Sequence, residues 1–369
     1  MSALGIIFSN IHDANLPELT ARRTMGSIPF GGRYRLIDFP LSSMVNSGIT
    51  KVGVITKNNY QSLMDHVGSG KDWDLARKNG GVVLLPPFFS NESGSLYETR
   101  LEALKGISGF LTHSYEEYVV MTDCDCVYSM DYSPVIEAHI ENAADVTMVY
   151  RTTAEVNDAH SHVVRLDDEG RVTEILSEVT GQSNKKRNYL LNIFVMKRTF
   201  LINLINDAVT HGYHHFLQAL TKGKRGMRLF GYRYDGYVSV VDSMMGYYKA
   251  SMELLDEKVR DALFHENAIY TKVRDSAPTK YGNFSVVGNS LVADGCIIEG
   301  EVENSILFRG VKVGRGSVVK NSILMQDTQV LENATVNCII TDKNVLVKER
   351  SVLSGSDEHP FYLAKNARA

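Results

Sequence analysis

The sequence has few cysteines, no long apolar run and no excess of basic residues. Four cysteines in 369 residues do not form a dense disulfide framework, which favours a reducing compartment. No stretch approaches the ~20 apolar residues that span a bilayer, and the first residues lack the basic and apolar segments of a signal peptide. With a net charge of −4, the chain offers no general electrostatic case for binding nucleic acid or an anionic membrane. We therefore expect a cytoplasmic protein whose partners are small molecules or other proteins.

Glycine is missing from a place where an α/β protein often needs it. The apolar segment LGIIF (4–8) predicts a strand that runs into the loop SNIHDANL (9–16), and no glycine lies between Ile6 and Thr24. A loop that binds phosphate through backbone N–H groups usually needs glycine, because glycine allows close approach and a positive φ. This loop is therefore not expected to hold a phosphate.

The first two-thirds of the chain alternates short β-branched runs with helical or loop segments. Such alternation favours a mostly parallel sheet that helices cover. Residues 245–264 then repeat apolar side chains at three- and four-residue steps, which predicts one long amphipathic helix. We expect an α/β domain over residues 1–250, a helix and linker over 251–282 and a second domain over 283–369. The expected strands are residues 4–8, 51–56, 118–123 and 145–150.

From residue 283, apolar side chains recur every six residues, with Gly and Asn at intervening positions. A sustained six-residue period is typical of a hexapeptide β-helix, in which each short strand forms one face of a triangular coil. The period slips by two residues after Ile298 and is broken once, at Lys312. We predict that the apolar rows form the core and that the open edges and flanks offer a surface for assembly. The rows are Val286, Val292, Ile298, Ile306, Val318, Leu324, Val330 and Val336.

The segment IPFGGRYRLIDFPLSSMVNSGITKVGVIT (28–56) follows the glycine-free loop. It resembles the P-F-G-G-K/R-Y/F-R-x-I-D-F-x-L-S-N-x-x-N-S-G-I motif of the pyrophosphorylases that make ADP-glucose. CDCVYSMDY (124–132) and YYKAS (247–251) resemble two further segments of that family, which also has a terminal β-helix. The resemblance covers essentially the whole chain. It implies a nucleotidyltransferase-like (Rossmann-like) α/β domain with a mixed sheet, followed by a left-handed parallel β-helix.

The same resemblance implies that several groups of the family's active site are replaced. The family's enzymes transfer an adenylyl group from ATP to glucose-1-phosphate, which requires Mg²⁺, cations and glycine amides around the phosphates. The family's glycine loop falls on residues 10–16, where Asn15 stands at its arginine and Asp13 is expected to repel phosphate. Met25 and Val179 stand at two phosphate-binding lysines, Val240 at a metal carboxylate, Asn192 at a glycine, and Arg100 and Leu101 at small residues.

One metal carboxylate of the family is retained as Asp125, which is either a remnant metal ligand or an ordinary turn residue. Asp242 lies two residues after Val240 and would share its face of a strand, so a local shift in register could restore a ligand. The combined loss of the glycines, both cations and one carboxylate indicates that this chain does not perform adenylyl transfer. It resembles the family's D-type subunit, a chain of low-GC Gram-positive bacteria that pairs with a catalytic subunit.

We therefore expect a regulatory or scaffolding subunit of glycogen biosynthesis that assembles with the catalytic chain, as a heterotetramer, and changes its activity or its response to effectors. On this interpretation the chain itself holds no cofactor, and Mg²⁺ is bound by the catalytic partner. Homo-oligomers of the lone chain are an open alternative. A different alternative is an active sugar-phosphate adenylyltransferase with a rearranged Mg²⁺ site built from Asp125 and Asp242. A hexapeptide acyltransferase is disfavoured, because no histidine lies between Glu266 and Glu358.

Arg22 and Arg23 occupy the place of a Lys-Arg pair that lies near an activator-phosphate site in related enzymes. Guanidinium groups suit phosphate geometry, so this pair is a candidate site for a phosphorylated-sugar effector, or else part of a solvated turn. Cys124 and Cys126 are interpreted as small buried side chains rather than a metal-binding pair. The two histidines at 214–215 are interpreted as surface or packing residues.

Overall fold

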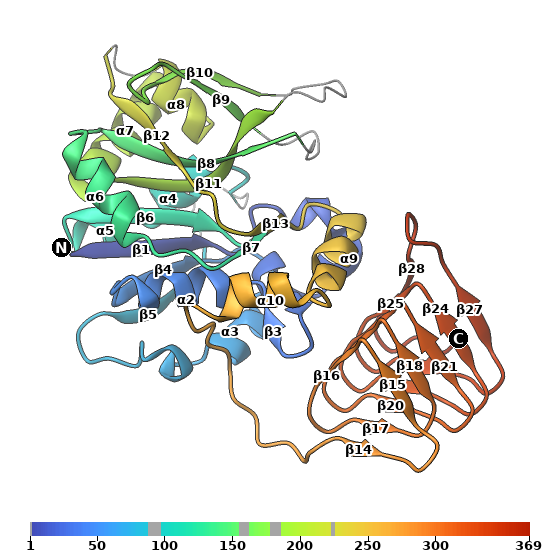
Figure 1. Ribbon diagram of the computed structural model, residues 1–369. Helices are drawn as coiled ribbons and strands as arrows, with labels where there is room; N and C mark the ends of the chain where they lie inside the picture. The colour runs from blue at the N-terminus through green and yellow to red at the C-terminus, as the bar shows by residue number, and fades with distance from the viewer. Residues whose placement is uncertain (1, 88–96, 155–161, 178–185, 223–225) are drawn as a thin grey trace.

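The computed structural model describes residues 2–87, 97–154, 162–177, 186–222 and 226–369. In this part of the chain, an N-terminal α/β domain lies beside a C-terminal coil of short strands (Figure 1). Every helix within these ranges is too short or too polar to span a bilayer.

The N-terminal domain is built on one mixed sheet. Its central strands β6, β1 and β4 are short apolar runs that pair in parallel, and β1 and β6 are buried along their whole length. Strand β11 runs antiparallel to both β6 and β8, which confirms the predicted mixed sheet. All four strands predicted from the sequence are present as β1, β4, β6 and β8. In spatial order the strands are β10 (Val172–Leu176), β9 (Val163–Leu166), β11 (Arg187–Lys197), β6 (Tyr118–Asp123), β1 (Ala3–Phe8), β4 (Lys51–Ile55) and β5 (Gly81–Leu85), with β8 (Val146–Thr153) between β11 and β12 (Leu229–Arg233).

Helices cover both faces of this sheet, and each layer of helices shares a hydrophobic core with one face. In Figure 1 the strands are stacked from top to bottom, with α2 and α6 in front of the sheet and α4 and α7 behind it. One layer contains α2 (Asp38–Asn46), α3 (Gln61–Val67) and α6 (Ser133–Glu141), and the other contains α4 (Arg100–Gly106), α5 (Ser108–Thr112), α7 (Arg198–His211) and α8 (Phe216–Lys222).

Residues 245–264 do not form the single long helix that their periodicity predicts. They contain most of α9 (Met244–Glu253) and, after a break, α10 (Glu257–Phe264). Asp256 starts the second helix, because its side chain accepts a hydrogen bond from the backbone N–H of Lys258. Leu254, in the break, is buried against the turn at Gly31. Capping and tertiary packing therefore interrupt an amphipathic pattern that continues through the break.

Smaller elements join the two domains. One short hairpin, one two-stranded antiparallel ribbon and one helical turn lie between the sheet and the β-helix, together with α9 and α10. They are β2 (Pro29–Phe30) with β3 (Tyr34–Arg35), β7 (Cys126–Tyr128) with β13 (Val238–Val240), and α1 (Pro17–Thr20).

The C-terminal domain is a left-handed parallel β-helix, as predicted. Its strands form three parallel sheets, one for each side of the coil. The chain turns sharply at each corner, and at one corner the residues Asn289, Asn304, Asn321 and Cys338 all have positive φ, which asparagine tolerates well. The sheets are β14 (Lys280–Tyr281), β17 (Ile297–Ile298), β20 (Lys312–Val313), β23 (Gln329–Val330) and β26 (Leu346–Val347); β15 (Val286–Gly288), β18 (Glu301–Glu303), β21 (Val318–Lys320), β24 (Thr335–Asn337) and β27 (Val352–Ser354); and β16 (Leu291–Val292), β19 (Ile306–Leu307), β22 (Ile323–Leu324), β25 (Ile339–Thr341) and β28 (Phe361–Leu363).

Part of the predicted β-helix core is shifted by one residue. Val286 is 63% exposed and Val318 is only partly buried, so these two residues do not belong to the core row. Their neighbour Val319 is fully buried instead, and Val313 fills the place beside Lys312 where the pattern had a break. In strands this short, the outward and inward residues recur with the same period, so the period alone does not distinguish them.

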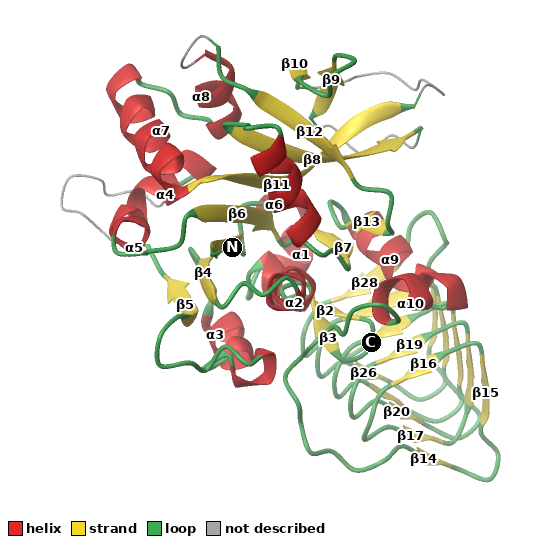
Figure 2. Ribbon diagram, turned by 60° about the vertical axis from the view of Figure 1, so that its left-hand side comes forward, coloured by secondary structure: helices red, strands yellow, loops and turns green. Residues whose placement is uncertain are grey.

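The sheet that contains β19 and β22 is buried on both faces. Leu307 and Leu324 belong to the core of the β-helix, whereas Ile306 and Ile323 pack against the N-terminal domain. Figure 2 shows this side of the coil next to α9 and α10. The two domains therefore share one apolar interface.

A buried ion pair also connects the two domains. The Nη2 atom of Arg23, in the N-terminal domain, lies 2.7 Å from both carboxylate oxygens of Asp342, in the β-helix. Both side chains are only 5% exposed, and the Tyr362 hydroxyl lies 3.4 Å from the same carboxylate. Removing one partner of such a pair leaves an uncompensated buried charge.

We expect Arg23→Met to lower the free energy of unfolding by about 3 kcal/mol, the scale of breaking a buried ion pair. The double variant Arg23→Met/Asp342→Asn should recover part of this loss, because no unpaired charge remains. Chemical denaturation of the unchanged chain and these two variants measures the loss and its recovery. A loss below about 0.5 kcal/mol in the single variant, typical of an exposed site, would contradict a buried pair between the domains.

Candidate functional site

The carboxyl ends of the parallel strands β1 and β6 lie side by side, since Phe8 pairs with Asp123. The loop after β1 and the turn after β6 therefore meet at one edge of the sheet, where α/β proteins commonly bind ligands. The glycine-free loop contributes His12, and the turn contributes Asp125. Both strand ends are buried in the core, so charged groups at this edge are partly shielded from water.

Four charged side chains gather here, and we call them the carboxylate cluster: His12, Arg100, Asp123 and Asp125. The Nε2 atom of His12 lies 2.7 Å from Oδ2 of Asp123 and 3.4 Å from Oδ2 of Asp125. Arg100 donates from Nε to Oδ1 of Asp123 at 3.2 Å and from Nη2 to Oδ2 of the same carboxylate. The Arg100 guanidinium also lies over the Phe8 ring. The cluster thus pairs the Asp123 carboxylate with Arg100 and His12, whereas Oδ1 of Asp125 has no hydrogen-bond partner among the described residues.

Arg100 is held in place by the start of helix α4. Thr99 caps this helix, and its hydroxyl accepts from the backbone N–H of Glu102, whose carboxylate in turn accepts from the backbone of Thr99. This reciprocal capping box sets the first helical residue, Arg100, at the sheet edge. On the other side, the Tyr97 hydroxyl donates to Oδ1 of Asn10 at 3.0 Å and so supports the loop that carries His12.

The cluster perturbs the protonation of its own members. Burial alone would raise the pKa of Asp123, but Arg100 and His12 outweigh burial and hold this pKa below its usual value. Burial would lower the pKa of His12, but the carboxylates of Asp125 and Asp123 outweigh it and raise this pKa. Burial raises the pKa of Asp125, and the charge of Asp123 adds to the effect while His12 and Arg100 oppose it. Asp123 is therefore ionised and paired with cations of the chain itself.

This donor set does not fit Mg²⁺. Among the described residues, the group of potential metal ligands at this edge is His12, Asp123 and Asp125, with ligand atoms within 4.8 Å of one another. Mg²⁺ prefers oxygen ligands, but Asp123 already binds Arg100 and His12, and His12 offers a nitrogen. Oδ1 of Asp125 is the one buried carboxylate oxygen of this group without a hydrogen-bond partner among the described residues, which is too few oxygen ligands for Mg²⁺. Asp242 does not belong to this group; its Oδ1 accepts from the Ser243 hydroxyl at 3.1 Å.

The residues predicted at lost functional positions have other roles here. Met25 is fully buried in the core, and its backbone N–H donates to Oδ1 of Asp13 at 2.7 Å. Asp13, which was expected to repel phosphate, anchors the loop through this bond, and burial raises its pKa to about 7. Asn15 ends a short 3₁₀ turn, and Val240 pairs with Cys126 in the two-stranded ribbon of β7 and β13. Val179 lies outside the described residues.

Sequence reasoning named Arg100 only as a bulky residue and did not name His12 or Asp123. The available signal was the aspartate at the end of a predicted buried strand, since a buried carboxylate requires a nearby cation or hydrogen-bond donors. These contacts could not be predicted from local sequence patterns, because His12 lies 111 residues and Arg100 lies 23 residues from Asp123.

The remaining predicted residues divide clearly by exposure. Arg22 is exposed, whereas Arg23 is buried and bound to Asp342, so only Arg22 is free to meet a ligand from solvent. Cys124 and Cys126 are buried free thiols, as predicted. The histidines at 214–215 are exposed, which confirms their interpretation as surface residues.

We expect Arg100→Met to destabilise the protein by about 3 kcal/mol, because the buried Asp123 carboxylate loses its main cation. Adding Asp123→Asn should restore much of this loss. Lys105→Met, at an exposed position of the same helix, is the matched control and should change stability by less than about 0.5 kcal/mol. Chemical denaturation gives all three values, and equal losses in Arg100→Met and the control would contradict the cluster.

We expect Asp13→Asn to stabilise the protein most at and above pH 7. Because the pKa of Asp13 is raised by burial from 3.8 to about 7, folding increasingly favours the protonated form between those values, and stability falls as pH rises through this window. Asparagine keeps the acceptor for Met25 without the charge. Unfolding curves at pH 4 and pH 8 test this, and a gain that is larger at pH 4 would contradict it.

Comparisons with known proteins agree with both domains. A family model described as Nucleotidyl transferase matches residues 14–178, and one described as GlmU-like, C-terminal hexapeptide matches residues 276–361. Together they confirm the predicted combination of a nucleotidyltransferase domain and a hexapeptide β-helix.

Curated relatives match nearly the whole chain. The glycogen biosynthesis protein GlgD of Bacillus subtilis is 38% identical over 98% of this chain and 95% of its own length. GlgD of Geobacillus stearothermophilus is 37% identical over 86% of this chain and 82% of its own length. A glucose-1-phosphate adenylyltransferase of Clostridium novyi is 31% identical over 86% of this chain and 84% of its own length. The chain therefore belongs to the GlgD branch of the glucose-1-phosphate adenylyltransferase family, the ADP-glucose pyrophosphorylases.

Proposed function

We propose that this chain is an accessory subunit of glucose-1-phosphate adenylyltransferase in glycogen biosynthesis and does not catalyse adenylyl transfer itself. The observation that carries this proposal is the carboxylate cluster, in which Arg100 and His12 neutralise Asp123 at the edge where the family's nucleotide site is expected. The names of the relatives, glycogen biosynthesis protein and glucose-1-phosphate adenylyltransferase, supply the pathway and the reaction.

The reaction makes demands that this edge of the sheet does not meet. An oxygen of glucose-1-phosphate attacks the α-phosphate of ATP, and the bond between the α- and β-phosphates breaks to release diphosphate. The spreading negative charge needs Mg²⁺, cations and backbone amides. Here Met25 is buried and uncharged, the loop of His12 and Asp13 has no glycine, and Arg100 is already bound to Asp123. In the proposed complex, Mg²⁺ is held by the catalytic partner.

The first coil of the β-helix supports the proposed assembly. Its side chains Tyr281, Phe284 and Val286 are 54%, 70% and 63% exposed. Strands β14, β15 and β16 each stand at the end of a sheet, with one side unpaired. Exposed apolar groups beside open strand edges are features of protein contact surfaces. This end of the coil is labelled at β14 and β15 in Figure 1.

An accessory chain acts on its partner through unequal affinity for the partner's conformations. A subunit that binds the active conformation more tightly shifts the population toward it, and a heterotetramer couples this shift to both catalytic chains. Arg22 is the exposed residue of the predicted effector pair, and we retain it as the candidate contact for a phosphorylated-sugar effector.

The test is an assay of diphosphate release by each chain alone and by the two chains purified together. We expect no release by this chain alone, a stable complex in size analysis, and a catalytic activity or effector response that differs from that of the partner alone. Absence of a complex together with unchanged kinetics would overturn the proposal.

The alternative enzyme, with Mg²⁺ on Asp125 and Asp242, predicts a different result. In that case this chain alone releases diphosphate, and Asp125→Asn abolishes the release. Under our proposal, Asp125→Asn in this chain leaves the activity of the complex within about twofold, because the residue acts in no chemical step.

A further inference from the structure

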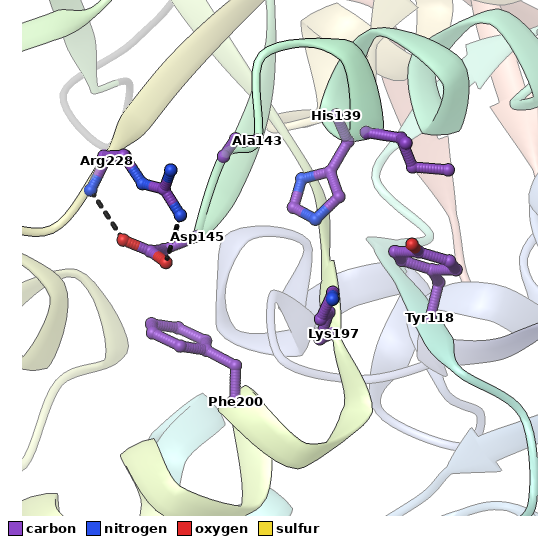
Figure 3. Close-up of a pocket in the computed structure, with 9 residues that line it drawn as sticks. Tyr118, His139, Ala143, Asp145, Lys197, Phe200 and Arg228 are labelled. Carbon is purple, nitrogen blue, oxygen red and sulfur yellow. Dashed lines mark hydrogen bonds and ion pairs between the residues drawn. The ribbon is translucent and has the colours of Figure 1, made fainter.

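A cavity of about 290 Å³ lies at the opposite end of the central strands from the carboxylate cluster. Tyr118 begins strand β6 here, whereas Asp123 ends it, about 16 Å away at the rise of a strand. Figure 3 shows the side chains around the cavity, which come from α6, α7 and the strands between them. The aromatic and charged side chains that line the cavity are Tyr118, His139, Asp145, Lys197, Phe200 and Arg228.

His139 is a buried histidine on the wall of this cavity, and one of its ring nitrogens has no hydrogen-bond partner among the described residues. It is 2% exposed, its Nδ1 lies 3.0 Å from the Thr147 hydroxyl, and its Nε2 has no hydrogen-bond partner among the described residues. In Figure 3 the imidazole and the Lys197 side chain point toward each other across the cavity. Burial lowers the pKa of His139 to about 4, and Lys197 adds to this effect while Asp145 opposes it. The ring is therefore neutral, with one nitrogen free to meet a ligand.

The charges around the cavity favour an anion. The Asp145 carboxylate is already engaged, because Oδ2 accepts from the backbone N–H of Arg228 at 2.8 Å and Oδ1 lies 3.5 Å from the guanidinium. Within the described part of the chain, the ion-pair partner of Lys197 is Glu117, at a loose 3.8 Å, and both of these side chains are more than half exposed. Such a pair is weak, so the Lys197 ammonium is available to another anion.

Helix α7 begins at the wall of the cavity, directly after Lys197. No described side chain caps this helix. The N–H of Arg198 donates to the Glu117 carbonyl at 2.8 Å, whereas the amides of Thr199 and Phe200 have no intrahelical acceptor. The positive end of a helix of this length favours an anion. Helix α6 ends on the opposite wall, but the backbone N–H groups of Ala143 and Ala144 already bond to its last carbonyls. The negative end of α6 therefore opposes an anion only weakly.

We propose that this cavity binds a small metabolite through an oxyanion, a phosphate monoester or a carboxylate, held by Lys197, the Nε2–H of His139 and the α7 amides of Thr199 and Phe200. The Thr147 hydroxyl then donates to Nδ1 of His139, which places the ring proton on Nε2. Tyr118, whose ring meets the His139 ring edge to face, and Phe200 provide apolar walls for the carbon skeleton. The volume lies at the lower limit for small-molecule pockets, which excludes a nucleotide. This site is independent of the proposed function.

Calorimetric titration of the full chain with inorganic phosphate, glucose-1-phosphate and acetate tests the site. We expect saturable binding of at least one probe and a loss of affinity of tenfold or more in Lys197→Met. Lys105→Met, which removes an exposed lysine elsewhere, is the matched control and should bind like the unchanged chain. Binding of phosphate or its ester identifies a phosphate ligand, and binding of acetate alone identifies a carboxylate.

A second variant and a spectroscopic signal complete the test. His139→Leu should still fold, because an apolar group fills the place of the ring although the Thr147 hydroxyl loses its partner, yet lose the same affinity. If this variant does not fold, the ring ¹⁵N signals of His139 in the intact chain decide, since ligand binding must shift Nε2. No binding of any probe, or equal binding by Lys197→Met and the control, would overturn the proposal.

Discussion

The Asp123 carboxylate lies buried at the end of the central strand β6, and it must be neutralised for the domain to fold. Its position follows from the parallel pairing of β1 and β6, which leaves little freedom to move it toward water. An unpaired charge in such a place costs several kcal/mol. The chain meets this requirement with His12 from the loop after β1 and Arg100 from the start of α4. The geometry of both loops therefore depends on one buried charge.

The same solution recurs between the domains, where the buried Arg23 guanidinium is neutralised by Asp342 of the β-helix. In both places the counter-charge is a side chain of the chain itself and not a bound ion or substrate. These internal ion pairs agree with the proposed accessory subunit, which acts by binding rather than by chemistry.

Sequence reasoning predicted the architecture well because that architecture rests on local patterns. Buried β-branched runs gave the strands β1, β4, β6 and β8, and the six-residue period gave the β-helix. It failed where tertiary contacts outweigh periodicity. The break between α9 and α10 depends on the Asp256 cap and on Leu254 packing against Gly31, and neither contact alters the amphipathic spacing. The outward position of Val286 could not be predicted for a different reason: the inward and outward residues of a short strand recur with the same period.

The candidate site was predicted only in part, because comparison with a motif records what is lost and not what replaces it. Asn192 shows the limit of that method: it stands at a glycine position, yet its φ of +54° keeps the left-handed conformation that glycine would supply. That replacement alone would not change the backbone. The loop that carries His12 is different, because its missing glycines coincide with a side chain that binds Asp123 directly. The loss of a phosphate-binding loop is stronger evidence about function when side chains of the chain itself, here His12 and Arg100, bind the carboxylate at that edge of the sheet.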